Sequence, residues 1–154
     1  MKVLLINPGA APQVREIEQS LKVMQELVEG TIEAIYPFEE PVAIICNEEG
    51  KLNGLPLNRA IISEETSDVV DIVAGKFLIT GLTDENFGSL TDEQIKMFSN
   101  KFRYPESFMQ IGRQIIRIIE DLPKQKESVM DKLKPKTTEM KDAVPKKKNK
   151  EISR

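Results

Sequence analysis

Three short apolar runs constrain the fold of this chain more than any other feature of its sequence. They occupy residues 3–6, 42–46 and 77–79 and consist mostly of Val, Ile and Leu. Short runs that end at turn residues, as the first does at residues 7–9, are typical of strands. A continuously apolar run such as 42–46 indicates a strand buried on both faces. The runs therefore predict a central β-sheet.

Apolar side chains with helical spacing predict that helices accompany this sheet. In residues 12–29 they recur at steps of three and four, with Pro12 suited to the first turn and Gly30 to the position after the end. The members of this stripe are Val14, Ile17, Leu21, Met24 and Leu27. A Thr and a Gln at capping-box spacing predict a helix over 91–102, and another helix is predicted over 106–120.

Further strands are predicted at residues 31–36 and 69–80, the second interrupted at Gly75. The run at 42–46 is predicted to form a β-hairpin with a return strand that begins at Lys51. We therefore expect an α+β fold, with a mixed sheet of about five strands, one packed helix and a C-terminal helical region. The order of the strands does not follow from the sequence.

Charge divides the chain near residue 121. Residues 1–121 hold 11 Lys and Arg against 20 Asp and Glu, a net charge of -9. Residues 122–154 hold 11 against 5, a net charge of +6. We expect a core domain at 1–88, C-terminal helices at 89–121 and a basic, largely disordered tail at 122–154, because the tail has few large apolar residues.

The basic run at 146–150 raises the question of nucleic acid. Phosphate contacts would make such binding salt-dependent, but the tail has no aromatic side chain to stack on bases. The acidic body would also repel nucleic acid. We expect at most weak binding through the tail. The alternatives are a solubilising tail or one that contacts the acidic body of a neighbour.

The residue inventory excludes several kinds of chemistry. The chain has no His, which removes Ser-His-Asp and Cys-His catalysis and His-based metal sites. Its single Cys, Cys46, cannot form an internal disulfide and is expected to be a buried core residue. Adjacent acidic pairs, such as 39–40 and 64–65, are interpreted as solvated turns and helix starts. No catalytic residue, metal or cofactor is predicted.

The sequence also indicates where in the cell the protein is expected. No run approaches the roughly 18 apolar residues of a membrane span. The N-terminal apolar run is too short for a secretion signal and lacks a small-residue cleavage site. A cytoplasmic location is therefore expected.

One polar cluster is the candidate site: Asn47, Glu48, Asn58 and Arg59. Amide groups and a guanidinium can bind a planar polar ligand or an anion. Turn chemistry explains Asn47 equally well, and an ion pair between Arg59 and Glu48 would account for the charged members. Both a ligand site and a structural role remain open at this point.

Residues 47–52, followed by 54–59, resemble the core of the DUF3846 family. The Pro8-Gly9 turn, the helix before Gly30 and the strand at 72–79 resemble the frame around that core, so the likeness spans about residues 1–105. The resemblance implies a small α/β domain carried by phages, plasmids and conjugative elements, and it implies no activity. Four residues match the family's motif and are carried over as site candidates: Asn47, Glu48, Asn58 and Arg59.

Three functions follow as hypotheses. The first is a non-catalytic accessory protein of a phage or mobile element that binds a host defence or nucleic-acid-processing protein, since an acidic body can compete for a basic patch. The second is a sponge or sensor that holds a nucleotide-like ligand through Asn47, Asn58 and Arg59, in a homo-oligomer. The third is an enzyme that uses a carboxylate such as Glu48 together with Arg59.

Overall fold

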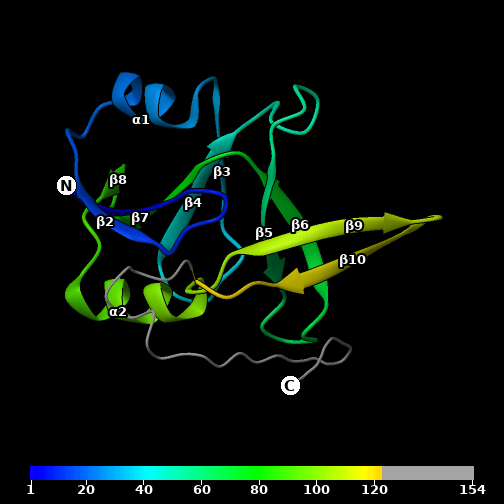
Figure 1. The fold of residues 1–154 in the computed structure, drawn as a ribbon. Helices are drawn as coiled ribbons and strands as arrows, with labels where there is room; N and C mark the ends of the chain where they lie inside the picture. The colour runs from blue at the N-terminus through cyan, green and yellow to red at the C-terminus, as the bar shows by residue number, and fades with distance from the viewer. Residues whose placement is uncertain (123–154) are drawn as a thin grey trace, which may run out of the picture. The chain divides into compact units, whose positions relative to one another are not determined.

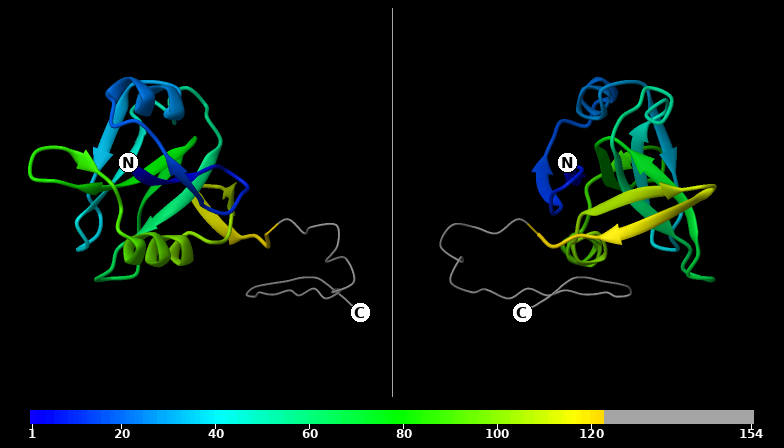
Figure 2. Two further views of the ribbon diagram at one scale, coloured as in Figure 1. Left: turned by 90° about the vertical axis from the view of Figure 1, so that its left-hand side faces the viewer. Right: turned by 45° about the vertical axis from the view of Figure 1, so that its right-hand side comes forward.

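The computed structural model describes residues 1–122 and contains a six-stranded sheet at its centre (Figures 1 and 2). The strands of this sheet are β1 (Lys2–Ile6), β2 (Gln13–Glu16), β3 (Ile32–Ile35), β4 (Val42–Asn47), β7 (Phe77–Leu82) and β8 (Phe87–Gly88). Their order is β2-β1-β7-β4-β3, with β8 paired to β7. The three apolar runs of the sequence are therefore the three central strands.

The three central strands are buried on both faces, as the apolar runs predicted, whereas the edge strand β2 is exposed. Helix α1 (Leu21–Val28) covers one face and helix α2 (Asp92–Lys101) lies on the other (Figure 1). Successive residues of a strand point to opposite faces. In β1, accordingly, Val3 packs with Met24 of α1, whereas Leu4 packs with Phe98 of α2.

Two further hairpins complete the described part of the chain. Strands β5 (Leu57–Ile62) and β6 (Val69–Ala74) form one, and β9 (Glu106–Ile111) and β10 (Gln114–Ile119) form the other. The β5–β6 hairpin contributes Ile61 and Val73 to the same core as α2. The β9–β10 hairpin extends to one side of the ribbon (Figure 1), and we refer to residues 105–120 as the arm.

The α+β class is confirmed, but the sheet is not mixed. Every strand pair among residues 1–122 is antiparallel. The hairpin predicted from 42–46 to Lys51 is also wrong, because β4 pairs with β3 and β7 and the chain turns away after Asn47. The strands predicted at 31–36 and 69–80 are confirmed. Gly75, at a φ of 82°, separates β6 from β7.

The helix predicted over 12–29 is half correct. Its first part is β2, whose residues 13–16 pair with β1 and form an edge of the central sheet. Ser20 then accepts a hydrogen bond from the amide of Val23 (3.3 Å) and caps α1, which therefore begins only at Leu21. The spacing of Val14 and Ile17 fits a helical stripe by coincidence, although both residues precede the start of α1.

The C-terminal helical region was wrong in its second half. The helix predicted over 91–102 is α2, and its capping box of Thr91 and Gln94 is present. Residues 106–120 form the β9–β10 hairpin instead of a helix. Gly112 has a φ of 62° and sits in the two-residue turn between the strands, a place that favours Gly. Residues 123–154, nearly all of the predicted tail, lie outside the described residues.

Candidate functional site

Asn47 joins the end of α1 to the loop after β4. Its side-chain amide donates to the carbonyls of Val28 (3.1 Å) and Glu29 (3.2 Å), and its Oδ1 accepts from the amide of Glu49 (2.8 Å). A Cβ at Gly30 would stand 2.6 Å from the Asn47 Nδ2, so this contact also requires glycine at that position. The polar groups of Asn47 thus bond the protein's own backbone.

Asn58 and Arg59 form a second internal cluster, and both side chains are fully buried. The Asn58 amide donates to the carbonyls of Ile6 (2.9 Å) and Gly75 (2.8 Å). Its Oδ1 accepts from Arg59 Nη1 (2.9 Å). Through these bonds Asn58 ties β5 to the ends of β1 and β6.

The Arg59 guanidinium reaches two further segments. Nη2 donates to the carbonyls of Ala10 (2.6 Å) and Phe102 (2.9 Å), and Nε donates to Phe102 as well (3.3 Å). Phe102 caps the C-terminus of α2, where the helix dipole favours a cation. Burial lowers the pKa of Arg59, and the carboxylate of Glu106 raises it. The guanidinium therefore cross-links the turn after β1, strand β5 and the end of α2.

The four candidates do not form one site: Asn58 and Arg59 bond each other, whereas Asn47 and Glu48 line a separate small hollow. The Glu48 side chain is exposed, and its amide donates to Thr31 (2.8 Å). No ion pair joins Glu48 to Arg59 within residues 1–122, and the Arg59 guanidinium donates instead to Asn58, Ala10 and Phe102. Glu48 instead lines a small hollow of about 130 Å³ beside Cys46, where Lys51 and Asp71 are paired at 2.6 Å.

Cys46 lies at the inner side of this hollow and is 6% exposed. Burial raises the pKa of the thiol to about 11; the carboxylates of Glu33 and Asp71 add to the rise and Lys51 opposes it. A thiolate is the reactive form of cysteine. The thiol therefore stays protonated at neutral pH, as a core residue would.

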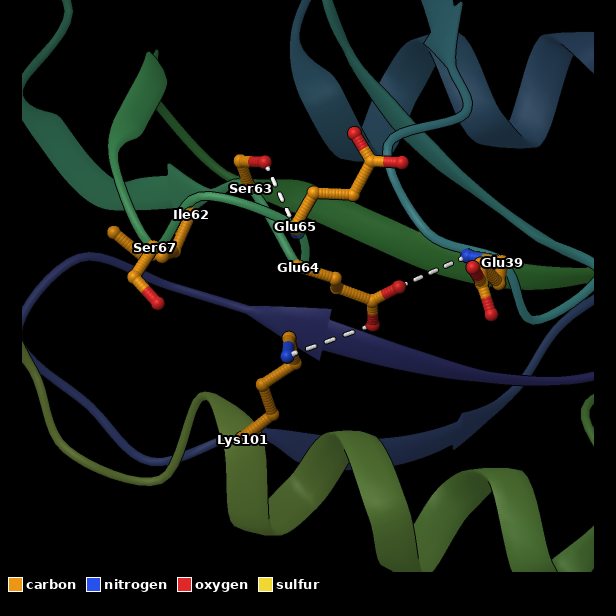
Figure 3. Close-up of a pocket in the computed structure, with 7 residues that line it drawn as sticks. All are labelled: Glu39, Ile62, Ser63, Glu64, Glu65, Ser67 and Lys101. Carbon is orange, nitrogen blue, oxygen red and sulfur yellow. Dashed lines mark hydrogen bonds and ion pairs between the residues drawn. The ribbon is translucent and has the colours of Figure 1, made fainter.

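A larger hollow, of about 530 Å³, lies between the β5–β6 turn, the loop before β4 and the end of α2 (Figure 3). We call it the acidic hollow. It is lined by Glu39, Ile62, Ser63, Glu64, Glu65, Ser67 and Lys101. Three carboxylates against one ammonium give this surface an excess of negative charge.

Hydrogen bonds within the protein orient part of the acidic hollow. Figure 3 shows the Glu64 carboxylate between two partners: Oε1 accepts from the amide of Glu39 (3.1 Å), and Oε2 lies 3.9 Å from Lys101 Nζ. Ser63 Oγ accepts from the amide of Glu65 (3.2 Å) and shapes the turn. Within residues 1–122 the carboxylates of Glu39 and Glu65 are in no ion pair.

Sequence reasoning did not single out the acidic hollow. Its carboxylates belong to the acidic pairs at 39–40 and 64–65, which were interpreted as solvated turns. Glu39 and Glu64, which contact each other, are 25 residues apart in the sequence. Only the tertiary fold brings the two acidic pairs together. Paired carboxylates on two loops were the available signal.

Several site types are absent from the part of the chain that the structure describes. No group of three His, Cys, Asp or Glu side chains in residues 1–122 is placed to hold a metal ion. None of the helices there is long and apolar enough to cross a membrane.

Comparison with known proteins defines the chain as one that carries a domain of unknown function. The model of the DUF3846 family matches residues 1–103, and the chain belongs to this family. The family's match includes Asn47, Asn58 and Arg59 and stops before the arm. No curated protein matches the chain, and no solved structure does.

Proposed function

We propose that this protein is a non-catalytic accessory protein of a phage or mobile element, which acts by binding a basic surface of a host protein. The acidic hollow is the observation that carries the proposal. Its Glu39 and Glu65 carboxylates are exposed and have no ion-pair partner within residues 1–122, so they are available to Lys or Arg side chains of a partner. A host defence or nucleic-acid-processing protein offers such a basic patch.

Electrostatics over a larger surface supports the same partner. Residues 1–121 have a net charge of -9, which attracts a basic protein before contact and raises the association rate. A host protein whose nucleic-acid-binding patch is covered in this way would lose access to its nucleic acid. The action requires no bond chemistry from the accessory protein, and its site is expected in the cytoplasm.

The nucleotide-binding hypothesis receives less support. It relied on Asn47, Asn58 and Arg59, whose amide and guanidinium groups bond backbone carbonyls of the chain itself. The small hollow beside Glu48, at about 130 Å³, is below the ~300 Å³ at which ligand sites typically begin. The enzyme hypothesis paired Glu48 with Arg59, and these two residues face different parts of the molecule.

A displacement assay tests the proposal. The full chain is titrated into complexes of fluorescent DNA with purified basic nucleic-acid-binding proteins. The triple variant Glu39→Gln, Glu64→Gln, Glu65→Gln is expected to displace DNA about tenfold less well, because each lost charge pair contributes a fraction of a kcal/mol to binding.

A matched variant controls for net charge. Glu18→Gln, Glu26→Gln, Glu93→Gln also removes three exposed carboxylates, but on other surfaces. It should displace DNA nearly as well as the wild-type chain. If no DNA is displaced from any basic protein at low salt, or if the two triple variants lose activity equally, the acidic hollow is not the binding site.

A further inference from the structure

The arm exposes apolar side chains on a scale that nothing else in the described residues matches. Six of them are between 38% and 56% exposed. They are Met109, Ile111, Ile115, Ile116, Ile118 and Ile119. Because a two-stranded hairpin is only marginally stable in water, such a surface indicates that another surface covers it.

One face of the arm is mostly apolar, with four apolar residues among its six. Side chains that stand opposite each other in an antiparallel pair share a face. Met109 stands opposite Ile116, and Ile118 and Ile111 complete this face with Ser107 and Gln114. The other face holds the ion pair of Glu106 with Arg117, at 2.9 Å. The two faces therefore differ in character, and the apolar one has no ionic group.

The outer edge of β10 is also open to pairing. The arm approaches the rest of the molecule through β9, where Glu106 accepts from the amide of Ala60 (2.9 Å). Among residues 1–122 no strand pairs with the other side of β10. The Glu120 amide donates to the Pro105 carbonyl (2.7 Å), so the backbone groups of residue 120 point toward β9. Because backbone groups point alternately toward and away from the paired strand, those of residues 115, 117 and 119 point outward.

We propose that the arm joins two copies of this chain, through antiparallel pairing of β10 with β10 of the second copy. A two-fold axis at Arg117 satisfies the outward backbone groups of both copies. It places Ile115 opposite Ile119 of the second copy and Ile116 opposite Ile118 of the second copy. The four isoleucines of each strand thus meet isoleucines, and the pairing is self-complementary, as a two-fold interface must be.

Charge favours a second copy over a charged partner. The arm holds two Arg and two Glu, so its net charge is zero, whereas residues 1–104 hold 9 basic and 17 acidic residues. A strongly basic or acidic partner would therefore find no net charge on the arm to attract it. Leu57, Val69 and Val70 line a hollow of about 300 Å³ with Ile115 and extend the apolar surface beyond the arm.

Sedimentation of the full chain over a concentration series tests the inference. We expect a species of twice the 17.4 kDa chain mass, and we expect added salt to maintain or strengthen it by screening repulsion between the acidic bodies. The variant Ile116→Thr, Ile118→Thr keeps β-branched side chains but should weaken dimerisation about tenfold or more. Val14→Thr, on the edge strand β2 and 53% exposed in the wild-type chain, is the matched control and should leave it unchanged.

Hydrogen exchange supplies a readout that does not depend on a variant. The amides of Ile115, Arg117 and Ile119 should become protected at concentrations where the dimer forms, and their exchange should be fast in the monomer. A monomeric wild-type chain at all concentrations would overturn the inference. A dimer that dissociates in added salt would also overturn it, because such a dimer would depend on attraction between the basic residues 122–154 and the acidic residues 1–121. A dimer that the variant Ile116→Thr, Ile118→Thr leaves intact would overturn it as well.

Discussion

At the scale of single residues, the buried Arg59 side chain links three segments of the described fold. Replacing it with Met keeps an unbranched apolar chain but leaves the carbonyls of Ala10 and Phe102 and the Oδ1 of Asn58 without their donor. Since each buried unsatisfied group costs about 1–3 kcal/mol, we expect the free energy of unfolding to fall by about 2–4 kcal/mol. Denaturant unfolding measures the change.

Two further variants make the Arg59 result specific. Arg59→Lys should recover little stability, because one ammonium cannot reproduce the planar fork that spans three acceptors. The exposed Arg103→Met should change stability by no more than about 0.5 kcal/mol. An Arg59→Met protein as stable as the wild type would show that the guanidinium is dispensable to the fold and would return Arg59 to the list of ligand candidates.

Cys46 predicts a pH dependence of stability. Its folded-state pKa of about 11 is above the ordinary value of 9.0, so the unfolded chain loses the thiol proton first as pH rises. The contribution of this group to stability is therefore complete below pH 9 and is lost between pH 9 and 11. Across this pH window the melting temperature of the wild type should fall more steeply than that of Cys46→Ala. Parallel curves for the two proteins would contradict the assignment.

At the scale of elements, Asn47 fixes how α1 ends. Asn47→Ala removes the donor to Val28 and Glu29 and the acceptor for the Glu49 amide, so we expect a loss of about 1–3 kcal/mol in unfolding free energy. Asn53→Ala, at an exposed position of the following turn, is the control and should be near neutral. Faster hydrogen exchange at the end of α1 would localise the effect, whereas equal losses in both variants would refute it.

Local patterns predicted the elements whose chemistry is local. The three apolar runs and the capping box of α2 were correct because burial and capping act within a few residues. The helix predictions over 106–120 and over the first part of 12–29 were wrong because apolar residues at helical spacing also occur in strands. Pairing with β1 or between β9 and β10 outweighed the helical pattern. A positive φ at Gly112 marks the turn that the spacing argument had interpreted as a helix interior.

The candidate site shows the same limit. The polar residues at 47 and 58–59 were correctly singled out as important positions. The sequence did not show that their hydrogen-bond partners are Val28, Ala10 and Phe102. Those partners are up to 49 residues away in sequence, so no spacing rule could have found them. The acidic hollow was missed for the same reason, since Glu39, Glu64 and Lys101 come from three separate segments.

At the scale of the whole molecule, the buried and the exposed polar groups of the described residues have different roles. Buried polar groups such as Arg59 bond the fold together, whereas the acidic groups that remain exposed give the surface its charge. The buried apolar residues of both core clusters lie between Val3 and Phe102, nearly the span that the family model matches. The arm lies beyond that span, which separates the family's fold from the surface that we infer to join two copies.

The proposal that the acidic hollow binds a basic partner can be tested on the protein alone. The most direct measurement is an NMR titration of the isotopically labelled full chain with an Arg- and Lys-rich peptide at low and high salt. We expect the largest shift changes at Glu39, at residues 63–67 and at Lys101, and we expect them to diminish as salt screens the charges. Absence of changes at low salt, or changes centred on another surface of residues 1–122, would contradict the claim.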